Sequence, residues 1–186
     1  RSPLVQPGWR ATCFRITSYR PRSSLRHQLS ASVRSGEELR KNNVRLRTIG
    51  HIGDLPPRVQ RVLAETIDYL SASTGLTLVL ARSYGGRDEI LDAARRLAEA
   101  CRRGELEPED IGPEEFAARL QTEGIPDPDL LIRPRGEMRI SNFLLWQLAY
   151  SEIYITKVLW PDFRGQHLIE AVEEFNRRER RFGRLA

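Results

Sequence analysis

Residues 130–156 read L-L-I-R-P-R-G-E-M-R-I-S-N-F-L-L-W-Q-L-A-Y-S-E-I-Y-I-T. The spacing of apolar residues predicts a strand at residues 130–132, an apolar helix at residues 142–150 and a strand at residues 153–156. Parallel strands need a long crossover connection, usually a helix, so this order favours a parallel pair. The stretch therefore predicts an α/β fold, with a mainly parallel sheet that is flanked by helices.

The alternation of strands and helices continues on the N-terminal side of this stretch and beyond its C-terminal end. Residues 44–49, V-R-L-R-T-I, alternate as a half-buried strand does, and residues 76–81 form a mostly apolar run typical of a strand buried on both faces. Helices are expected after Pro56-Pro57, after Tyr84-Gly85-Gly86, from Pro113 to about Gln121 and from about Gly165. The apolar residues expected on their inner faces are Val59, Val62, Leu63, Ile67 and Leu70, then Ile90, Ala94, Leu97, Ala98 and Cys101, and in the last helix Leu168, Ile169, Val172 and Phe175.

Two loops follow predicted strands at their carboxyl ends, residues 82–87 and residues 133–141. Open parallel sheets bind ligands beyond the carboxyl ends of their strands. We expect both loops to leave the same edge of one sheet and the functional site to lie there.

Length and composition are those of one folded domain with a basic surface. The 186 residues carry a formal net charge of +5, which allows an anionic partner such as nucleic acid, a phosphorylated metabolite or a membrane surface. Cys13 and Cys101 indicate neither a disulfide framework nor a metal site, so we expect a reduced, cytoplasmic setting. No apolar run predicts a membrane span or a signal peptide.

Residues 1–35 differ from the rest because they are rich in Arg and Ser and lack periodicity over any useful length. We interpret them as a loose basic arm, followed by a folded domain at residues 36–186. The alternative is a basic tail that binds nucleic acid or anionic lipid.

Three arginines lie in the loop at residues 133–141: Arg133, Arg135 and Arg139. Ser141 falls at the predicted N-cap of the following helix, where a hydroxyl, free amides and the helix dipole favour an anion. Guanidinium groups add bidentate, charge-assisted hydrogen bonds that suit a diphosphate. The loop is therefore predicted to bind phosphate oxygens and to supply no nucleophile. The alternatives are simple capping by Ser141 and a solvated arginine surface.

Other polar segments leave more than one interpretation open. Gly85 and Gly86 allow close approach of a ligand, but a tight turn is favoured, and no dinucleotide-binding or phosphate-loop motif occurs. Glu152 is either solvated or, beside a diphosphate, an oxygen ligand for Mg²⁺. The basic run at residues 177–184 is a solvated face, a nucleic-acid patch or a tail that reaches a phosphate.

Residues 130–163 resemble, almost throughout, the signature of the cis-prenyltransferase family, whose typical member is a bacterial undecaprenyl diphosphate synthase. The resemblance extends to N-R-R-E-R-R-F-G near the C-terminus and back through S-Y-G-G-R-D-E-I to V-R-L-R-T-I-G. It implies an Mg²⁺-dependent, cytoplasmic homodimer that condenses isopentenyl diphosphate with an allylic diphosphate in cis geometry and works beside the membrane that receives its polyprenyl product. Nucleic acid is not expected as a partner, since no recognised binding motif accompanies the charge.

The resemblance also implies a role for each matching site residue. Arg133, Arg139 and Ser141 would bind the diphosphate of isopentenyl diphosphate. Glu152 would help to hold Mg²⁺, with a contribution across the dimer interface. Arg181 and Gly183, in an R-x-G motif, would reach toward the diphosphate bound by the partner subunit.

The chain departs from the family pattern in two places. The motifs D-G-N-G-R-W and F-S-x-E-N-W-x-R have no match, so no residue is assigned the role of the catalytic Asp. We therefore expect the family fold without its first strands, residues 1–35 that are misread or divergent, and impaired turnover. The alternative function is a non-catalytic subunit of a complete cis-prenyltransferase. Arg135 stands where many members have a small residue, and it adds charge beside the site.

Overall fold

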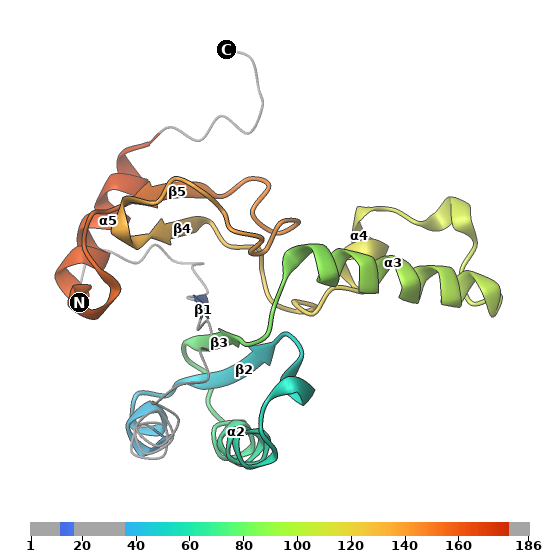
Figure 1. Ribbon diagram of the computed structural model, residues 1–186, viewed down its shortest axis with the longest axis horizontal. Coiled ribbons are helices and arrows are strands. Elements are labelled where there is room, and N and C mark those ends of the chain that lie inside the picture. Colours follow the sequence, from blue (N-terminus) through green and yellow to red (C-terminus); the bar gives the residue numbers. More distant parts are fainter. Residues whose placement is uncertain (1–11, 17–35, 179–186) are drawn as a thin grey trace. The chain divides into compact units, whose positions relative to one another are not determined.

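The computed structural model describes residues 12–16 and 36–178 (Figure 1). The chain forms two compact units, an N-terminal unit at Arg10–Pro126 and a C-terminal unit whose described part begins at Asp127. Each unit has its own parallel sheet and helices, which confirms the predicted α/β class. No helix in the described ranges combines the length and the apolar character that crossing a membrane requires.

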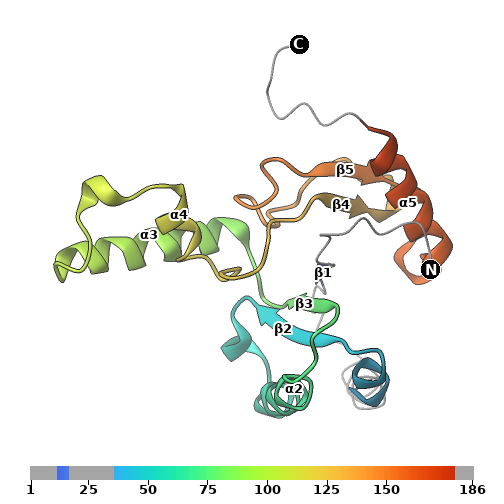
Figure 2. The same ribbon diagram turned by 180° about the vertical axis from the view of Figure 1, so that it is seen from behind.

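The N-terminal unit is built on a three-stranded parallel sheet in the order β1-β3-β2. The strands are β1 at Thr12–Ile16, β2 at Arg45–Ile49 and β3 at Thr77–Ala81. Helix α2, at Pro57–Tyr69, joins β2 to β3. Pro57 suits the first position of the helix because a backbone N–H at that position would have no acceptor within the helix, and proline has no N–H. Figure 2 shows α2 lying beside the β2–β3 pair. The core includes Leu46, Ile49, Val59, Leu70 and Val79.

Helices α3, at Gly86–Arg102, and α4, at Pro113–Ala117, also belong to this unit, as does a short helix at residues 36–41. Helix α4 is shorter than the segment expected to reach Gln121. The buried face of α3 consists of Gly86, Glu89, Ala93, Leu97 and Ala100. Of the five positions expected to face inward, Leu97 is buried, Ile90 and Cys101 are half-buried, and the prediction was wrong for Ala94 and Ala98, which are exposed. The stripe is displaced because Glu89, a charged residue, is turned inward and hydrogen-bonded there.

The C-terminal unit pairs β4, at Leu130–Arg133, with β5, at Glu152–Ile155, in parallel. Helix α5, at Gly165–Arg177, packs on β5 within the same unit, as Figures 1 and 2 both show. Ala171 and Phe175 are buried on α5, whereas Leu168 and Ile169 are 48% and 44% exposed. The prediction that these two residues face inward was wrong, because the two-stranded sheet buries only part of the apolar face of α5.

The helix predicted at residues 142–150 is absent, and this part of the described chain consists of bends and turns. Ser141, Asn142 and Leu144 have φ values of 57°, 57° and 45°, which a right-handed helix cannot contain. Phe143, Leu144 and Leu148 are nevertheless buried. Burial of the apolar side chains is thus achieved without regular helical hydrogen bonding.

The described strands form two sheets, one in each unit, and the loops at residues 82–87 and 133–141 follow strands of different units, so the expectation that both loops leave one sheet edge stays a prediction. One further expectation about the fold was wrong. Strand β1 lies in residues 1–35, for which we expected no regular element, and it is hydrogen-bonded to β3 from Thr12↔Thr77 to Ile16↔Ala81. The domain boundary at residue 35 stays a prediction.

Candidate functional site

The arginine loop after β4 gathers charged side chains around one carboxylate, that of Glu137. Arg133 Nη2 donates to Glu137 Oε2 at 3.1 Å, and Arg139 Nη2 donates to Glu137 Oε1 at 3.0 Å. Arg133 Nη2 also lies 3.4 Å from the hydroxyl oxygen of Ser141. The structure therefore brings together Arg133, Arg139 and Ser141, and it adds Glu137, to which the sequence pattern assigned no role.

Backbone hydrogen bonds hold this loop against the segment that follows β5. The Gly136 amide donates to the Thr156 carbonyl at 2.8 Å, and the Arg135 amide donates to the Val158 carbonyl at 3.1 Å. The Thr156 amide returns a bond of 3.0 Å to the Arg133 carbonyl. Arg135 adopts a φ of 71° in this turn, and its side chain is exposed. The loop is thus anchored through its backbone, so its charged side chains are not needed to hold it in place.

The two arginines differ in exposure and therefore in freedom. The Arg133 side chain is 15% exposed, whereas the Arg139 side chain is 70% exposed. Arg133 Nε is buried and has no hydrogen-bond acceptor among the described residues. Two guanidinium groups, one half-buried and one exposed, converge on the same carboxylate and leave the site with a net positive charge. Such a site can bind an anion but has no group placed to attack one.

Ser141 does not have the role predicted for it in helix capping. Its φ of 57° lies in the left-handed region, and no helix follows it. The free amides and the dipole expected at a helix N-terminus are therefore missing from this site. What Ser141 contributes is a hydroxyl beside Arg133.

Glu152 does not join this cluster in the described chain. It pairs with Leu130 at the start of the β4–β5 ladder, whereas Arg133 pairs with Ile155 at its end. Three residues of strand separate the two positions by about 10 Å along the strand. Arg178 Nη1 donates to Glu152 Oε2 at 3.0 Å, and Arg178 Nε lies 3.4 Å from Glu174 Oε1. The hydrogen bond to Glu152 is the main cause that raises the pKa of Arg178 above its ordinary value.

The described residues do not by themselves fit an Mg²⁺ ion. No group of three or more His, Cys, Asp or Glu residues within the described ranges could hold a metal. Glu152 offers one carboxylate, and Arg178 already pairs with it. Magnesium is usually held by one or two carboxylates together with waters and substrate phosphates, so the described residues would supply at most one of its ligands, from a carboxylate that Arg178 already occupies. Arg181 and Gly183, the other residues predicted from the resemblance, lie outside the described residues.

We expect Glu152→Ala to act on stability rather than on anion binding. The variant removes the main partner of Arg178, so the free energy of unfolding should fall by about 1 kcal/mol. Pyrophosphate affinity should stay within about twofold of the unaltered chain, because Glu152 lies at the other end of the strand pair. Urea denaturation and titration calorimetry measure the two effects. A large loss of affinity would place Glu152 in the anion site.

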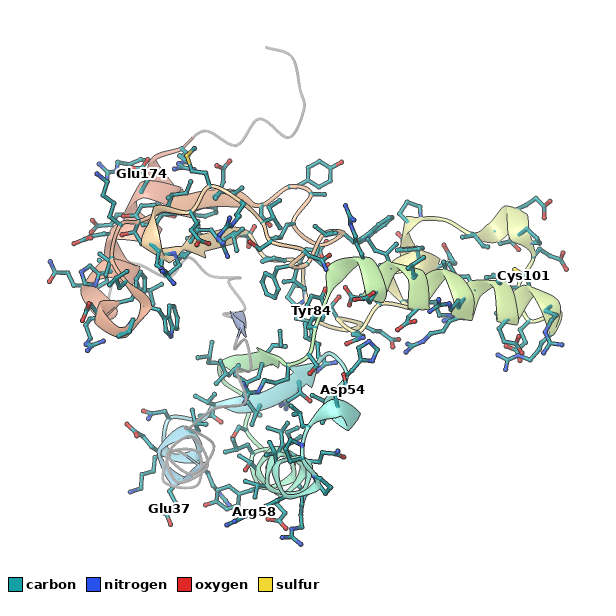
Figure 3. The ribbon with its side chains drawn as sticks, in the orientation of Figure 1. Glu37, Asp54, Arg58, Tyr84, Cys101 and Glu174 are labelled. Atoms are coloured by element: carbon teal, nitrogen blue, oxygen red, sulfur yellow. The ribbon has the colours of Figure 1, made fainter. Side chains whose placement is uncertain are left out.

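In the N-terminal unit, the loop after β3 is held by a polar network. Tyr84, labelled in Figure 3, lies where β3 gives way to α3. The Tyr84 hydroxyl donates to Glu89 Oε2 at 2.5 Å, and Glu89 Oε1 accepts from the backbone N–H of Gln121 at 2.9 Å. Gln121 Oε1 in turn accepts from the Gly50 amide. The network ties the ends of β2 and β3 together, which supports the favoured interpretation of the glycine loop as a tight turn.

Sequence reasoning missed the central residues of this network. Glu89 is only 2% exposed, although glutamate is among the residues least often buried. The sequence does place Glu89 in the first turn of α3, three residues after Gly86. A carboxylate there is favourable even when it points outward, so its position did not indicate burial. The inward orientation of Glu89 is seen in its hydrogen bonds to Tyr84 and Gln121, which form only once the chain has folded.

Comparison with known proteins places these observations in a family. Residues 21–183 match the family model Prenyltransf, which describes undecaprenyl diphosphate synthases. An isoprenyl transferase of Geobacter sulfurreducens is 50% identical over 145 residues, which are 78% of this chain and 59% of that protein. An isoprenyl transferase of Porphyromonas gingivalis is 52% identical over 149 residues, again 59% of its length. The chain thus spans about 59% of the length of these curated relatives.

Two solved structures resemble the fold of this chain. Lavandulyl diphosphate synthase from Lavandula x intermedia, crystallised with dimethylallyl diphosphate, is 35% identical with a TM-score of 0.81, and the match covers 88% of this chain and 74% of that one. A probable undecaprenyl diphosphate synthase from Campylobacter jejuni is 32% identical with a TM-score of 0.75, and the match covers 94% and 84% of the two chains. The resemblance expected from residues 130–163 is confirmed, and the chain belongs to the Prenyltransf family, the family of undecaprenyl diphosphate synthases.

Proposed function

We propose that this chain binds the diphosphate of isopentenyl diphosphate at Arg133 and Arg139, with Ser141 beside them, as one half of a prenyl-transfer site. The observation that carries the proposal is the convergence of two guanidinium groups on a single carboxylate, at 3.1 and 3.0 Å. Diphosphate oxygens accept the same charge-assisted hydrogen bonds as a carboxylate does, and they carry more charge.

In the proposed reaction, isopentenyl diphosphate adds to an allylic diphosphate. The carbon–oxygen bond to the allylic diphosphate breaks, the isopentenyl double bond attacks that carbon, and a proton is lost to give a cis alkene and free diphosphate. Arg133 and Arg139 would hold the diphosphate of the attacking substrate, which keeps its charge throughout. Their contribution is to position that substrate. The catalytic Asp of the family has no match in this chain, so no residue here is assigned to the departure of the allylic diphosphate.

The names of the relatives support this class of reaction. The curated relatives include isoprenyl transferases and a ditrans,polycis-undecaprenyl-diphosphate synthase, so a polyprenyl diphosphate is the proposed product. Lavandulyl diphosphate synthase was crystallised with dimethylallyl diphosphate, an allylic diphosphate. Mg²⁺ is proposed from the family resemblance, with Glu152 as one of its ligands. No step is assigned to the metal, since the described residues do not complete its site.

Assembly and location are proposed on the same resemblance. A homodimer would allow Arg181 and Gly183 of one chain to reach the substrate diphosphate of its partner, and Glu152 to act across the interface. A cytoplasmic enzyme that touches the membrane surface could pass its lipid product to the bilayer. Turnover by the isolated chain is proposed to be impaired. The second candidate function is a non-catalytic subunit of a complete cis-prenyltransferase.

The test of the binding proposal is calorimetry with isopentenyl diphosphate and with pyrophosphate. Arg133→Ala removes the less exposed of the two arginine donors, and we expect affinity for both ligands to fall about 30-fold or more. The matched control is Arg61→Ala, which removes the same charge from an exposed position on α2 and should change affinity by less than about twofold. Equal affinity of Arg133→Ala and the unaltered chain would refute the proposal.

Two further measurements separate the candidate functions. Mixing the purified chain with farnesyl and isopentenyl diphosphates should give little or no product, and measurable condensation would contradict the proposed impairment. Co-purification with a complete relative would favour the non-catalytic subunit. Sedimentation as a monomer at micromolar concentration would contradict the homodimer.

A further inference from the structure

Glu137 occupies the centre of the proposed diphosphate site with a negative charge of its own. Each of its carboxylate oxygens accepts a hydrogen bond from a different arginine, Arg133 at 3.1 Å and Arg139 at 3.0 Å. These Nη2 donors are among those that the proposed function assigns to the diphosphate. A bound diphosphate would therefore meet both competition for donors and repulsion from a like charge.

We propose that Glu137 is a built-in competitor for the diphosphate site, which holds the two arginines in the free chain and turns away when the diphosphate binds. This inference rests on the proposed function of Arg133 and Arg139. A carboxylate that bridges two guanidinium groups presents two acceptor oxygens close together, much as one phosphate group does. Glu137 thus fills the place of the ligand.

The exposures of the three side chains decide which of them moves. Arg133 is 15% exposed, whereas Glu137 is 35% exposed and Arg139 is 70% exposed. The backbone of Arg133 is also held, since its carbonyl accepts from the Thr156 amide at 3.0 Å. Arg133 therefore stays in place as the fixed donor. Glu137 and Arg139 can reorient, so that the diphosphate replaces the carboxylate on both guanidinium groups.

Internal competition of this kind sets a threshold for occupancy by anions. Displacing Glu137 costs about the same free energy for every anion, so it lowers each affinity by a similar factor. Anions that make few hydrogen bonds, such as chloride or inorganic phosphate, then bind too weakly to fill the site. A diphosphate makes enough charge-assisted contacts to overcome the cost. The competitor thereby keeps weakly bound anions out of the site without a separate contact to the prenyl chain, while the ratio of any two affinities stays the same.

The test is Glu137→Gln, which keeps the size of the side chain and one acceptor oxygen but removes the charge. We expect pyrophosphate to bind about tenfold more tightly in titration calorimetry, and inorganic phosphate to gain by a similar factor. The matched control is Glu105→Gln, which removes one charge from an exposed glutamate paired with Arg103 at 2.9 Å and should leave affinity within about twofold.

The possible outcomes separate this inference from the proposed function. Unchanged or weaker pyrophosphate binding by Glu137→Gln would overturn the proposal that Glu137 is a competitor. Weaker binding would also show that Glu137 serves to orient the arginines. If Arg133→Ala still lowers the affinity about 30-fold or more in that case, the diphosphate site itself stands. If the unaltered chain and Glu137→Gln both fail to bind pyrophosphate, the proposed function and the inference fall together.

Discussion

Gly50→Ala is expected to lower the free energy of unfolding of the N-terminal unit by more than about 3 kcal/mol. Gly50 has a φ of 103°, a conformation that residues with a side chain rarely adopt. A Cβ atom at this position would lie 1.8 Å from the carbonyl oxygen of Arg82 and 3.1 Å from Cβ of Tyr84. The clash is with backbone, so the loops after β2 and β3 would have to separate.

The separation would break hydrogen bonds that join these loops. The Arg82 amide donates to the Ile49 carbonyl at 2.9 Å, and the His51 amide donates to the Ser83 carbonyl at 3.2 Å. Urea denaturation followed by circular dichroism measures the loss, and hydrogen exchange should show it at the amides of Arg82 and His51. Gly53→Ala is the matched control, because a Cβ atom at Gly53 would meet nothing within 4 Å and the φ of this glycine is not in the left-handed region. Equal effects of the two substitutions would contradict the steric explanation.

Glu89→Ala is expected to destabilise the same unit by about 2–4 kcal/mol. The substitution removes a side chain that is 2% exposed and leaves two donors without this acceptor, the Tyr84 hydroxyl and the Gln121 amide. A buried donor that loses its acceptor costs the free energy of desolvation that the bond had offset. The end of β3 would also lose its side-chain link to α3.

Chemical denaturation of Glu89→Ala, Glu89→Gln and Tyr84→Phe tests this explanation. The glutamine variant keeps an acceptor and the volume of the side chain, so it should lose only about 1 kcal/mol. Tyr84→Phe removes one donor, and combining it with Glu89→Ala should be less costly than the sum of the two single changes. Asp88→Ala, at an exposed neighbouring position of α3, is the control and should change stability by less than about 1 kcal/mol. Strict additivity would mean that Tyr84 and Glu89 do not stabilise each other.

Regular elements with a clear local pattern could be predicted closely. The apolar run at residues 76–81 and the alternating run at residues 44–49 correspond to β3 and β2, and Pro56-Pro57 marks the start of α2. These signals are local, because period and proline geometry depend on neighbouring residues alone. The prediction of a helix at residues 142–150 was wrong because it also rested on a local pattern alone. The apolar composition of this segment requires burial, and burial is achieved by turns with left-handed residues.

The candidate site, too, was predictable only in part from the sequence. Three arginines between a strand and an apolar run are visible in the sequence, as is the family resemblance that connects Arg133, Arg139 and Ser141 with a diphosphate. The hydrogen bonds of Glu137 to both Arg133 and Arg139 are not, because residues two and four apart in a loop have no regular spacing to place them together. The pairing of Glu152 with Arg178 joins residues 26 positions apart and likewise depends on how α5 packs on β5.

By itself, the sequence determined the α/β class, most of the strands and helices, the family and the arginine loop, because periodicity, proline positions and a long matching motif are properties of consecutive residues. Tertiary structure alone decided which charges meet. It turned Glu89 inward, paired Glu152 with Arg178 and placed Glu137 between the two arginines proposed to bind the diphosphate. Hydrogen bonds and ion pairs act over a few ångströms, and the distances between side chains exist only once the chain has folded.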